Sequence, residues 1–153
     1  MGLFLSKANY KNGTPTFKGA TQVYPMFNGL LFRLCDPRKK RWGFYNDSPE
    51  YTMHVAILFK DDSHIVPLGS ATLHRTTGPE NGKSDKKRWH VVEVDIAPLT
   101  TEMFVEGQVT GWDIDTLEAR TSTDGRVFRL REQKDRNNKY MGLMTPTWRN
   151  SVG

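Results

Sequence analysis

Residues 51–59, YTMHVAILF, alternate in a way that strongly limits the fold of this chain. Successive side chains of a β-strand point to opposite faces, so every second residue lies on the same side. One face of this segment would carry Tyr51, Met53, Val55, Ile57 and Phe59. Residues 90–96, HVVEVDI, repeat the pattern, with His90 and apolar residues on one face and both carboxylates on the other. The two segments predict strands that each bury one face in a core.

Shorter segments also have the composition of strands, and Asn-Gly, Asp-Pro and Asp-Gly pairs lie between them as turn formers. These segments are residues 29–35, 42–45, 70–74, 103–105 and 127–130. Helical periodicity is weak throughout, and only residues 115–120 are compatible with a single helical turn. We therefore predict an all-β fold, a single antiparallel β-sandwich or barrel of about seven to nine short strands.

The two ends of the chain lack this alternation. Residues 1–20 contain few core candidates and several Asn, Gly, Thr and Pro residues, which predicts a flexible amino-terminal arm. Residues 132–153 form a basic carboxy-terminal tail, predicted to be poorly ordered. The β domain is therefore expected to span residues 21–131.

Positive charge is unevenly distributed in the chain, whose formal net charge is +5. Residues 1–35 contain no acidic residue, and basic residues also cluster at 38–41, 83–88 and 126–139, whereas residues 102–124 are acidic. This asymmetry predicts an anionic partner, either phospholipid headgroups, nucleic acid or an acidic protein surface. The alternative is that basic loops only keep the domain in solution.

The first residues, MGLFLSK, match the pattern for N-terminal myristoylation after removal of Met1. Gly2 would accept the acyl group, and Ser6 and Lys7 complete the motif. No apolar run approaches the ~20 residues of a bilayer-spanning helix. Residues 3–5 are also too few for the apolar region of a secretory signal.

A single myristoyl chain binds bilayers only marginally, so durable attachment needs a second signal. Basic residues near an anionic leaflet each contribute about 1 kcal/mol, and apolar residues beside the acyl chain add insertion. The residues expected to contact the membrane are Leu3, Phe4, Leu5, Lys7, Lys11 and Lys18.

Four stretches of the sequence resemble a known family. They are NGLLFR at residues 28–33, WGFYND at 42–47, EYTMHV at 50–55 and PLTTEMFVEGQVTG at 98–111. Together they resemble the amino-terminal domain of the kinetoplastid calpain-related proteins, in particular their small stand-alone myristoylated members. Dually acylated members carry Cys directly after the acceptor glycine, whereas this chain has Leu3. The resemblance ends near residue 111.

The resemblance implies a mainly antiparallel β domain, an acylated Gly2 and a non-catalytic role. We expect a scaffold or adaptor at the cytoplasmic face of the plasma membrane, flagellum or flagellar pocket, or at the cortical cytoskeleton. Its expected partners are anionic membrane lipids and an unidentified protein, with a cytoskeletal protein as one candidate. No nucleic-acid partner is expected.

Catalysis is not expected from the residues either. A papain-like enzyme needs a thiolate activated by histidine, yet Cys35 lies in a predicted strand and nothing resembles the calpain catalytic domain. Cys35 is predicted to be a buried core residue. The four histidines, His54, His64, His74 and His90, lack the close spacing of a zinc site. We expect no catalytic residue, no metal and no cofactor other than covalent myristate.

Two alternatives remain open from the sequence. The segment RWGFY at residues 41–45 faintly resembles the base-stacking strand of an RNA-binding domain, and the calculated pI of about 9.4 fits nucleic acid. A closed β-barrel could instead carry a lipid or hold the protein's own acyl chain. The aromatic residues Trp42, Phe44, Tyr51 and Phe104, with Met53, are expected to be core residues instead.

Overall fold

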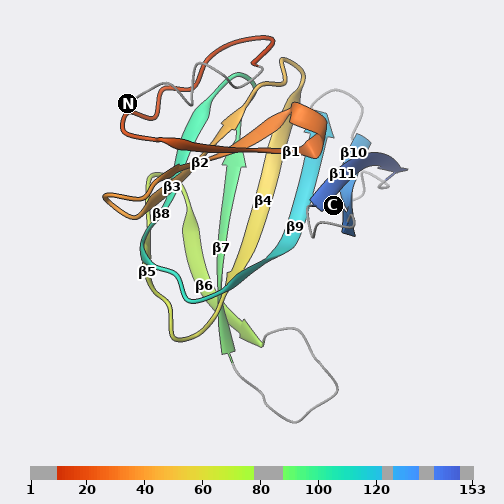
Figure 1. Cartoon of the computed structure of the whole chain (residues 1–153). Helices are drawn as coiled ribbons and strands as arrows, with labels where there is room; N and C mark the ends of the chain where they lie inside the picture. Colours follow the sequence, from red (N-terminus) through yellow and green to blue (C-terminus); the bar gives the residue numbers. More distant parts are fainter. Residues whose placement is uncertain (1–9, 78–87, 122–125, 135–139, 149–153) are drawn as a thin grey trace.

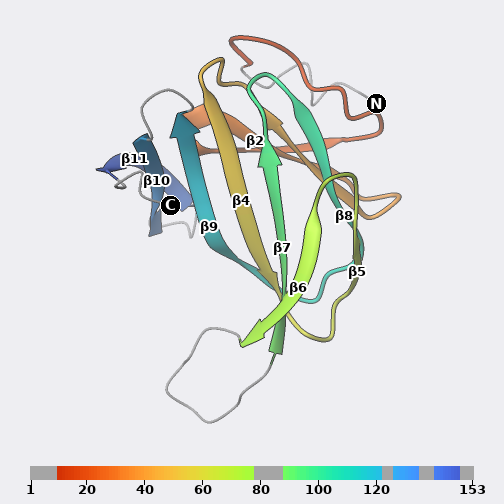
Figure 2. The ribbon, with the colours of Figure 1, turned by 180° about the vertical axis from the view of Figure 1, so that it is seen from behind.

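The computed structural model describes residues 10–77, 88–121, 126–134 and 140–148, which form two antiparallel sheets and one short 3₁₀ turn (Figure 1). The first sheet consists, in spatial order, of β1 (Gln22–Met26), β2 (Leu31–Asp36), β3 (Arg41–Asn46), β8 (Thr101–Gln108) and β5 (His64–Pro67). The second consists of β11 (Tyr140–Trp148), β10 (Arg126–Lys134), β9 (Trp112–Thr121), β4 (Tyr51–Phe59), β7 (Arg88–Ile96) and β6 (Thr72–Thr77). Figure 2 shows β9, β4, β7 and β6 side by side from behind. The 3₁₀ turn η1 (Phe27–Gly29) connects β1 to β2.

The predicted all-β sandwich is confirmed, with eleven strands among the described residues instead of about seven to nine. β4 covers residues 51–59 as predicted, and β7 begins at Arg88. β1, β5, β9 and β11 were not predicted. The helical turn suggested for residues 115–120 is wrong, because these residues lie in β9 and pair with β4. A register shift between Ala56 and Ile57 marks an irregularity in this pairing, which interrupts the alternation that would have revealed the strand.

The main core lies between the two sheets. Alternate residues of β4 and β7 face it, as the sequence pattern predicts. Its fully buried members include Phe27, Leu31, Phe44, Met53, Val55, Ile57, Phe59, Val92, Ile96 and Phe104. The rings of Phe44 and Phe104 meet edge to face with centroids 5.0 Å apart. Large side chains from both sheets therefore interdigitate and hold the sandwich together.

A second apolar cluster covers the opposite face of β2 and β3. Phe32, Leu34 and Tyr45 alternate with core-facing residues on these strands, so they point away from the main core. Phe17 and Ala20, at 7% and 2% exposure, pack on them. The expectation of a flexible arm over residues 1–20 is therefore wrong for residues 10–20, which we call the docked segment. Residues 1–9 lie outside the described residues.

A poorly ordered tail was predicted to begin at residue 132, but two strands extend beyond this boundary. β10 continues to Lys134, and β11 pairs with it antiparallel from Tyr140 to Trp148. β10 also pairs with β9 and so extends the second sheet. The described residues form no helix long and apolar enough to cross a bilayer.

Candidate functional site

A buried carboxylate fixes the beginning of the docked segment. Asp47, 1% exposed, accepts the backbone N–H of Lys11 at 2.7 Å and that of Asn12 at 3.1 Å. It also accepts the hydroxyl of Tyr45 at 2.8 Å. Three donors on one carboxylate compensate the loss of hydration on burial. The side chain of Tyr10 packs edge-on against Phe32 and Tyr45, so the chain leaves the body at a defined point.

Two glycines let the docked segment approach the first sheet closely. A Cβ on Gly43 would lie 2.9 Å from the Phe17 ring, so that ring rests on the backbone of β3. Gly19 has φ +93°, a conformation that favours glycine, and passes beside the Asp36 carboxylate. The N–H of Thr21 then donates to the carbonyl of Cys35 at 2.9 Å and leads into β1.

The β2–β3 hairpin ends in a strongly basic turn. We call residues 37–40, Pro-Arg-Lys-Lys, the basic turn. The Asp36 carboxylate accepts the backbone N–H groups of Arg38 at 3.1 Å and Lys39 at 3.4 Å. Lys40 adopts φ +54°, and its carbonyl accepts the N–H of Gly107 on β8 at 2.9 Å. These contacts fix the backbone of the turn and leave its basic side chains exposed.

The docked segment and the basic turn together line a groove of about 980 Å³. Lys18 lies on the docked segment, and Arg38 and Lys39 lie on the turn. With Lys40 they form a set of exposed cations that we call the basic surface. Such a surface can attract anionic headgroups without reading any particular chemical structure.

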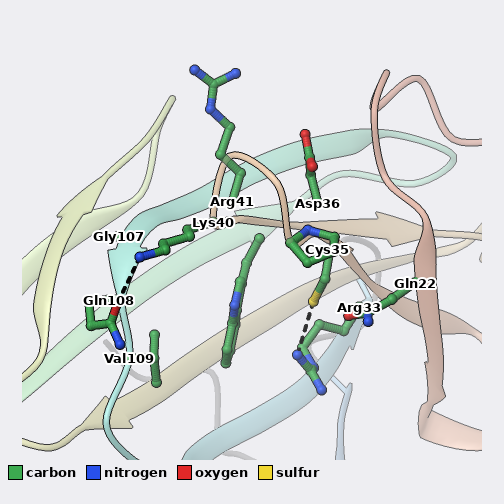
Figure 3. A pocket seen from close by; sticks show the side chains of 11 residues that line it. Gln22, Arg33, Cys35, Asp36, Lys40, Arg41, Gly107, Gln108 and Val109 are labelled. Carbon is green, nitrogen blue, oxygen red and sulfur yellow. Dashed lines mark hydrogen bonds between the residues drawn. The ribbon is translucent and has the colours of Figure 1, made fainter.

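A smaller hollow of about 370 Å³ lies where the basic turn meets the end of the sandwich (Figure 3). We call it the end hollow. Its walls include Arg33, Cys35, Lys40, Trp42 and Gln108. The Trp42 ring meets Trp112 of the opposite sheet with centroids 5.3 Å apart, so the hollow lies close to the junction of the two sheets.

The Arg33 guanidinium is stacked among three aromatic rings. Its central carbon lies 4.2 Å from the ring centroid of Tyr24, 4.5 Å from that of Trp42 and 4.8 Å from that of Trp112. One terminal nitrogen donates to Cys35 Sγ at 3.1 Å. Burial lowers the pKa of Arg33, and Cys35 and Tyr24 oppose that shift. Burial raises the pKa of the Cys35 thiol, so Arg33 lies beside a neutral sulfur at pH 7.

The structure places only part of the residues predicted to contact a membrane. Gly2, Leu3, Phe4, Leu5, Ser6 and Lys7 lie outside the described residues. Lys11 and Lys18 are exposed, and only Lys18 lines the groove beside the basic turn. Sequence reasoning recognised the basic cluster at 38–41 but could not place it beside Lys18. It missed Arg33, whose only signal was a basic residue inside an apolar strand.

Cys35 is buried as predicted, at 6% exposure. His54 pairs with Asp95 at 2.6 Å, and His90 Nε2 lies 3.1 Å from the carbonyl oxygen of Asp61. The residues that the structure describes contain no group of three or more His, Cys, Asp or Glu able to hold a metal ion. Phe44 and Tyr45, which the RNA-binding alternative requires on the surface, are both fully buried.

Known proteins similar to this chain were found by sequence and by structure. Residues 10–122 match the family described as "Domain of unknown function (DUF1935)". A Leishmania major hypothetical protein of known structure is 51% identical, with a TM-score of 0.64, over 76% of this chain and 94% of that one. The NMR structure of SMP-1 (Small Myristoylated Protein) from Leishmania major is 35% identical, with a TM-score of 0.62, over 81% of this chain and 92% of that one. None of the curated proteins matches the sequence.

Proposed function

The chain belongs to the DUF1935 family, and we propose that it is a non-catalytic, N-myristoylated peripheral membrane protein. The observation that carries the proposal is the acceptor motif, with Gly2 and Ser6, in a chain similar to SMP-1, the Small Myristoylated Protein. Its role is that of a scaffold or adaptor at the cytoplasmic face of the plasma or flagellar membrane, or at the cortical cytoskeleton. The relation to calpains, implied by the sequence motifs, stays a prediction.

The basic surface supports this proposal because it supplies the second signal that one acyl chain needs. Myristate alone gives an association constant of order 10⁴ M⁻¹. Lys18 on the docked segment and Arg38 and Lys39 on the basic turn line one groove. The docked segment follows the amino-terminal acylation motif in the chain. Each basic residue close to an anionic leaflet adds about 1 kcal/mol. Attachment is then steady but reversible, and sensitive to salt.

The packed interior makes an adaptor a better proposal than a lipid carrier. Phe44, Phe59, Phe104 and Met53 fill the space between the sheets and are fully buried. An acyl chain could enter there only by displacing them, at a cost of several kcal/mol. The rings of Phe44 and Tyr45 are likewise not accessible for stacking on bases, which argues against a nucleic-acid platform on β3.

Metabolic labelling tests the acylation directly. Cells expressing the wild-type chain or Gly2→Ala receive an alkyne analogue of myristate, and the purified chains are probed by click chemistry and by mass spectrometry of the amino-terminal peptide. We expect label and an acylated Gly2 in the wild type alone. Ser6→Ala, which leaves the acceptor in place, should label more weakly. A free or acetylated Gly2 in the wild type would end the proposal.

Fluorescence microscopy of cells expressing the same two chains tests the location. A carboxy-terminal fluorescent tag should follow the cell periphery or flagellum in the wild type and become diffuse in Gly2→Ala. An identical distribution of the two chains would show that the acyl group does not determine location.

A further inference from the structure

Arg33 is a fixed cation without an acidic partner among the described residues. The ion pairs among the described residues join Arg41 to Glu106, Arg120 to Glu118, and two histidines to carboxylates. Arg33 instead has three aromatic rings and a neutral sulfur around it. The guanidinium is partly desolvated, and this burial lowers its pKa. A half-buried guanidinium of this kind gains strongly from an anionic ligand.

The other walls of the end hollow add donors and little competing negative charge. Lys40 Nζ donates to the neutral amide oxygen of Gln108 at 2.8 Å, so its positive charge is not neutralised there. In Figure 3, Lys40 and Arg33 come from different sides of the hollow, and Arg41 points away from it. Among the described residues of the lining, the one carboxylate belongs to Asp36, whose Oδ1 accepts two backbone N–H groups of the basic turn.

We propose that the end hollow binds a phosphate monoester group, with Arg33 as its bidentate anchor and Lys40 as a second cation. Stacking on the rings fixes the plane of the guanidinium, whose paired N–H groups match two oxygens of a phosphoryl group. A phosphate monoester carries between one and two negative charges near pH 7 and three terminal oxygens, so it can accept from both cations. The volume of about 370 Å³ suits a small phosphorylated group.

The same chemistry is offered by two sources, a phosphomonoester lipid headgroup and a soluble phosphate ester. The site lies on the folded body and does not require acylation at Gly2. Binding can therefore be measured on the full-length Gly2→Ala chain, in which acyl insertion plays no part. If the end hollow does not bind phosphate, the proposed membrane anchor is unaffected. If Gly2 is not acylated, the proposed phosphate site is unaffected.

The first experiment titrates inorganic phosphate into the ¹⁵N-labelled Gly2→Ala chain at constant ionic strength. We expect saturable shifts of the indole N–H signals of Trp42 and Trp112, whose rings contact Arg33. The indole of Trp89 packs in a separate cluster with Ala56, Leu58 and Val91 and serves as the internal control. Shifts that fail to saturate, or that are equal at Trp89, would overturn the proposal.

Substitutions then assign the binding to the anchor. Arg33→Gln should weaken phosphate binding at least tenfold, because a hydrogen bond to a charged group contributes about 1.5–3 kcal/mol. Arg33→Lys keeps the charge without the planar fork and should weaken it less. Arg38→Gln is the matched control, since it removes one cation from the basic turn outside the hollow. Equal losses from Arg33→Gln and Arg38→Gln would indicate only diffuse attraction and refute the site.

Lys40→Gln covers the case in which Arg33→Gln does not fold. Lys40 is exposed, so its substitution should leave thermal unfolding unchanged and still weaken phosphate binding several-fold. Binding by this variant at wild-type strength would contradict the role of Lys40 as second cation.

Vesicles distinguish the two sources of phosphate. Phosphatidylcholine vesicles containing phosphatidic acid present a phosphomonoester, and vesicles with phosphatidylserine at matched surface charge do not. Stronger binding to the former that is lost in Arg33→Gln supports a lipid headgroup. Saturable binding of inorganic phosphate with no such preference supports a soluble ester. Absence of both effects refutes the site.

Discussion

The ring of Phe17 rests on Gly43 of β3, at a place where a Cβ on the glycine would lie 2.9 Å from the ring. The docked segment is therefore held by shape as well as by apolar contact. Any side chain at position 43 competes with Phe17 for the same space. Since this segment leads from the amino-terminal motif to Lys18, the contact helps to determine where the basic surface forms.

Gly43→Ala should destabilise the fold by about 1–3 kcal/mol, the usual cost of overpacking. The added methyl group must displace the Phe17 ring, and it also comes within 3.1 Å of the Glu102 carbonyl. Urea unfolding followed by tryptophan fluorescence measures the effect. In a Phe17→Ala background the ring is gone, so the cost of Gly43→Ala should be smaller by at least about 0.5 kcal/mol. Additive effects would show that the two residues do not compete.

Two adjacent tyrosines should respond oppositely to loss of the hydroxyl. The rings of Tyr10 and Tyr45 lie 5.5 Å apart. The Tyr45 hydroxyl donates to Asp47, whereas the buried Tyr10 hydroxyl has no hydrogen-bond partner among the described residues. Tyr45→Phe should therefore cost about 1–2 kcal/mol of unfolding free energy, and Tyr10→Phe should be neutral or slightly stabilising. Comparable losses in the two variants would mean that the Tyr10 hydroxyl has a partner.

The strands recognised from sequence are those whose local pattern decides their structure. β4 and β7 alternate clearly because each presents one face to the main core, and Met53, Val55 and Ile57 are fully buried there. β9 was missed because its pairing with β4 shifts register and its sequence carries acidic residues at intervals. β1 and β5 are short edge strands that each contain a proline, which weakens any strand signal.

The candidate sites depend on contacts between distant parts of the sequence. Phe17 is a single aromatic residue in a polar stretch, and its partner Gly43 gives no apolar signal. The cage around Arg33 is built from Tyr24, Trp42 and Trp112, which three separate strands bring together. Only the folded sheets show that this arginine is stacked on rings and has no acidic partner among the described residues, whereas the acylation predicted at Gly2 rests on a purely local pattern.

Stability should fall at alkaline pH. Burial and, to a smaller extent, the neighbouring Asp47 raise the pKa of Tyr10 and Tyr45 above the ordinary value of 10.0. The folded chain thus retains protons that the unfolded chain releases, so this stabilisation is complete below pH ~10 and is lost as the pH rises further. Each group contributes a slope of up to about 1.4 kcal/mol per pH unit. Cys35, with a pKa also raised by burial, adds to the trend.

Urea unfolding from about pH 8 to about pH 12 measures this slope. Tyr45→Phe should make the alkaline decline shallower even though it lowers the stability at neutral pH. Tyr51→Phe, which removes the hydroxyl of a half-buried tyrosine in β4, is the control. An unchanged slope in Tyr45→Phe would assign the alkaline transition to other groups.

Removing cations from the basic surface should weaken membrane binding of the acylated chain. Lys18→Gln with Lys39→Gln removes two charges from the groove beside the docked segment, and at about 1 kcal/mol each the loss is about 25-fold. Sedimentation with phosphatidylserine vesicles measures it. Lys60→Gln with Arg75→Gln removes two exposed charges elsewhere and should have a much smaller effect. The difference between the two pairs should shrink as salt shortens the Debye length, and equal losses would show that net charge, not this surface, governs binding.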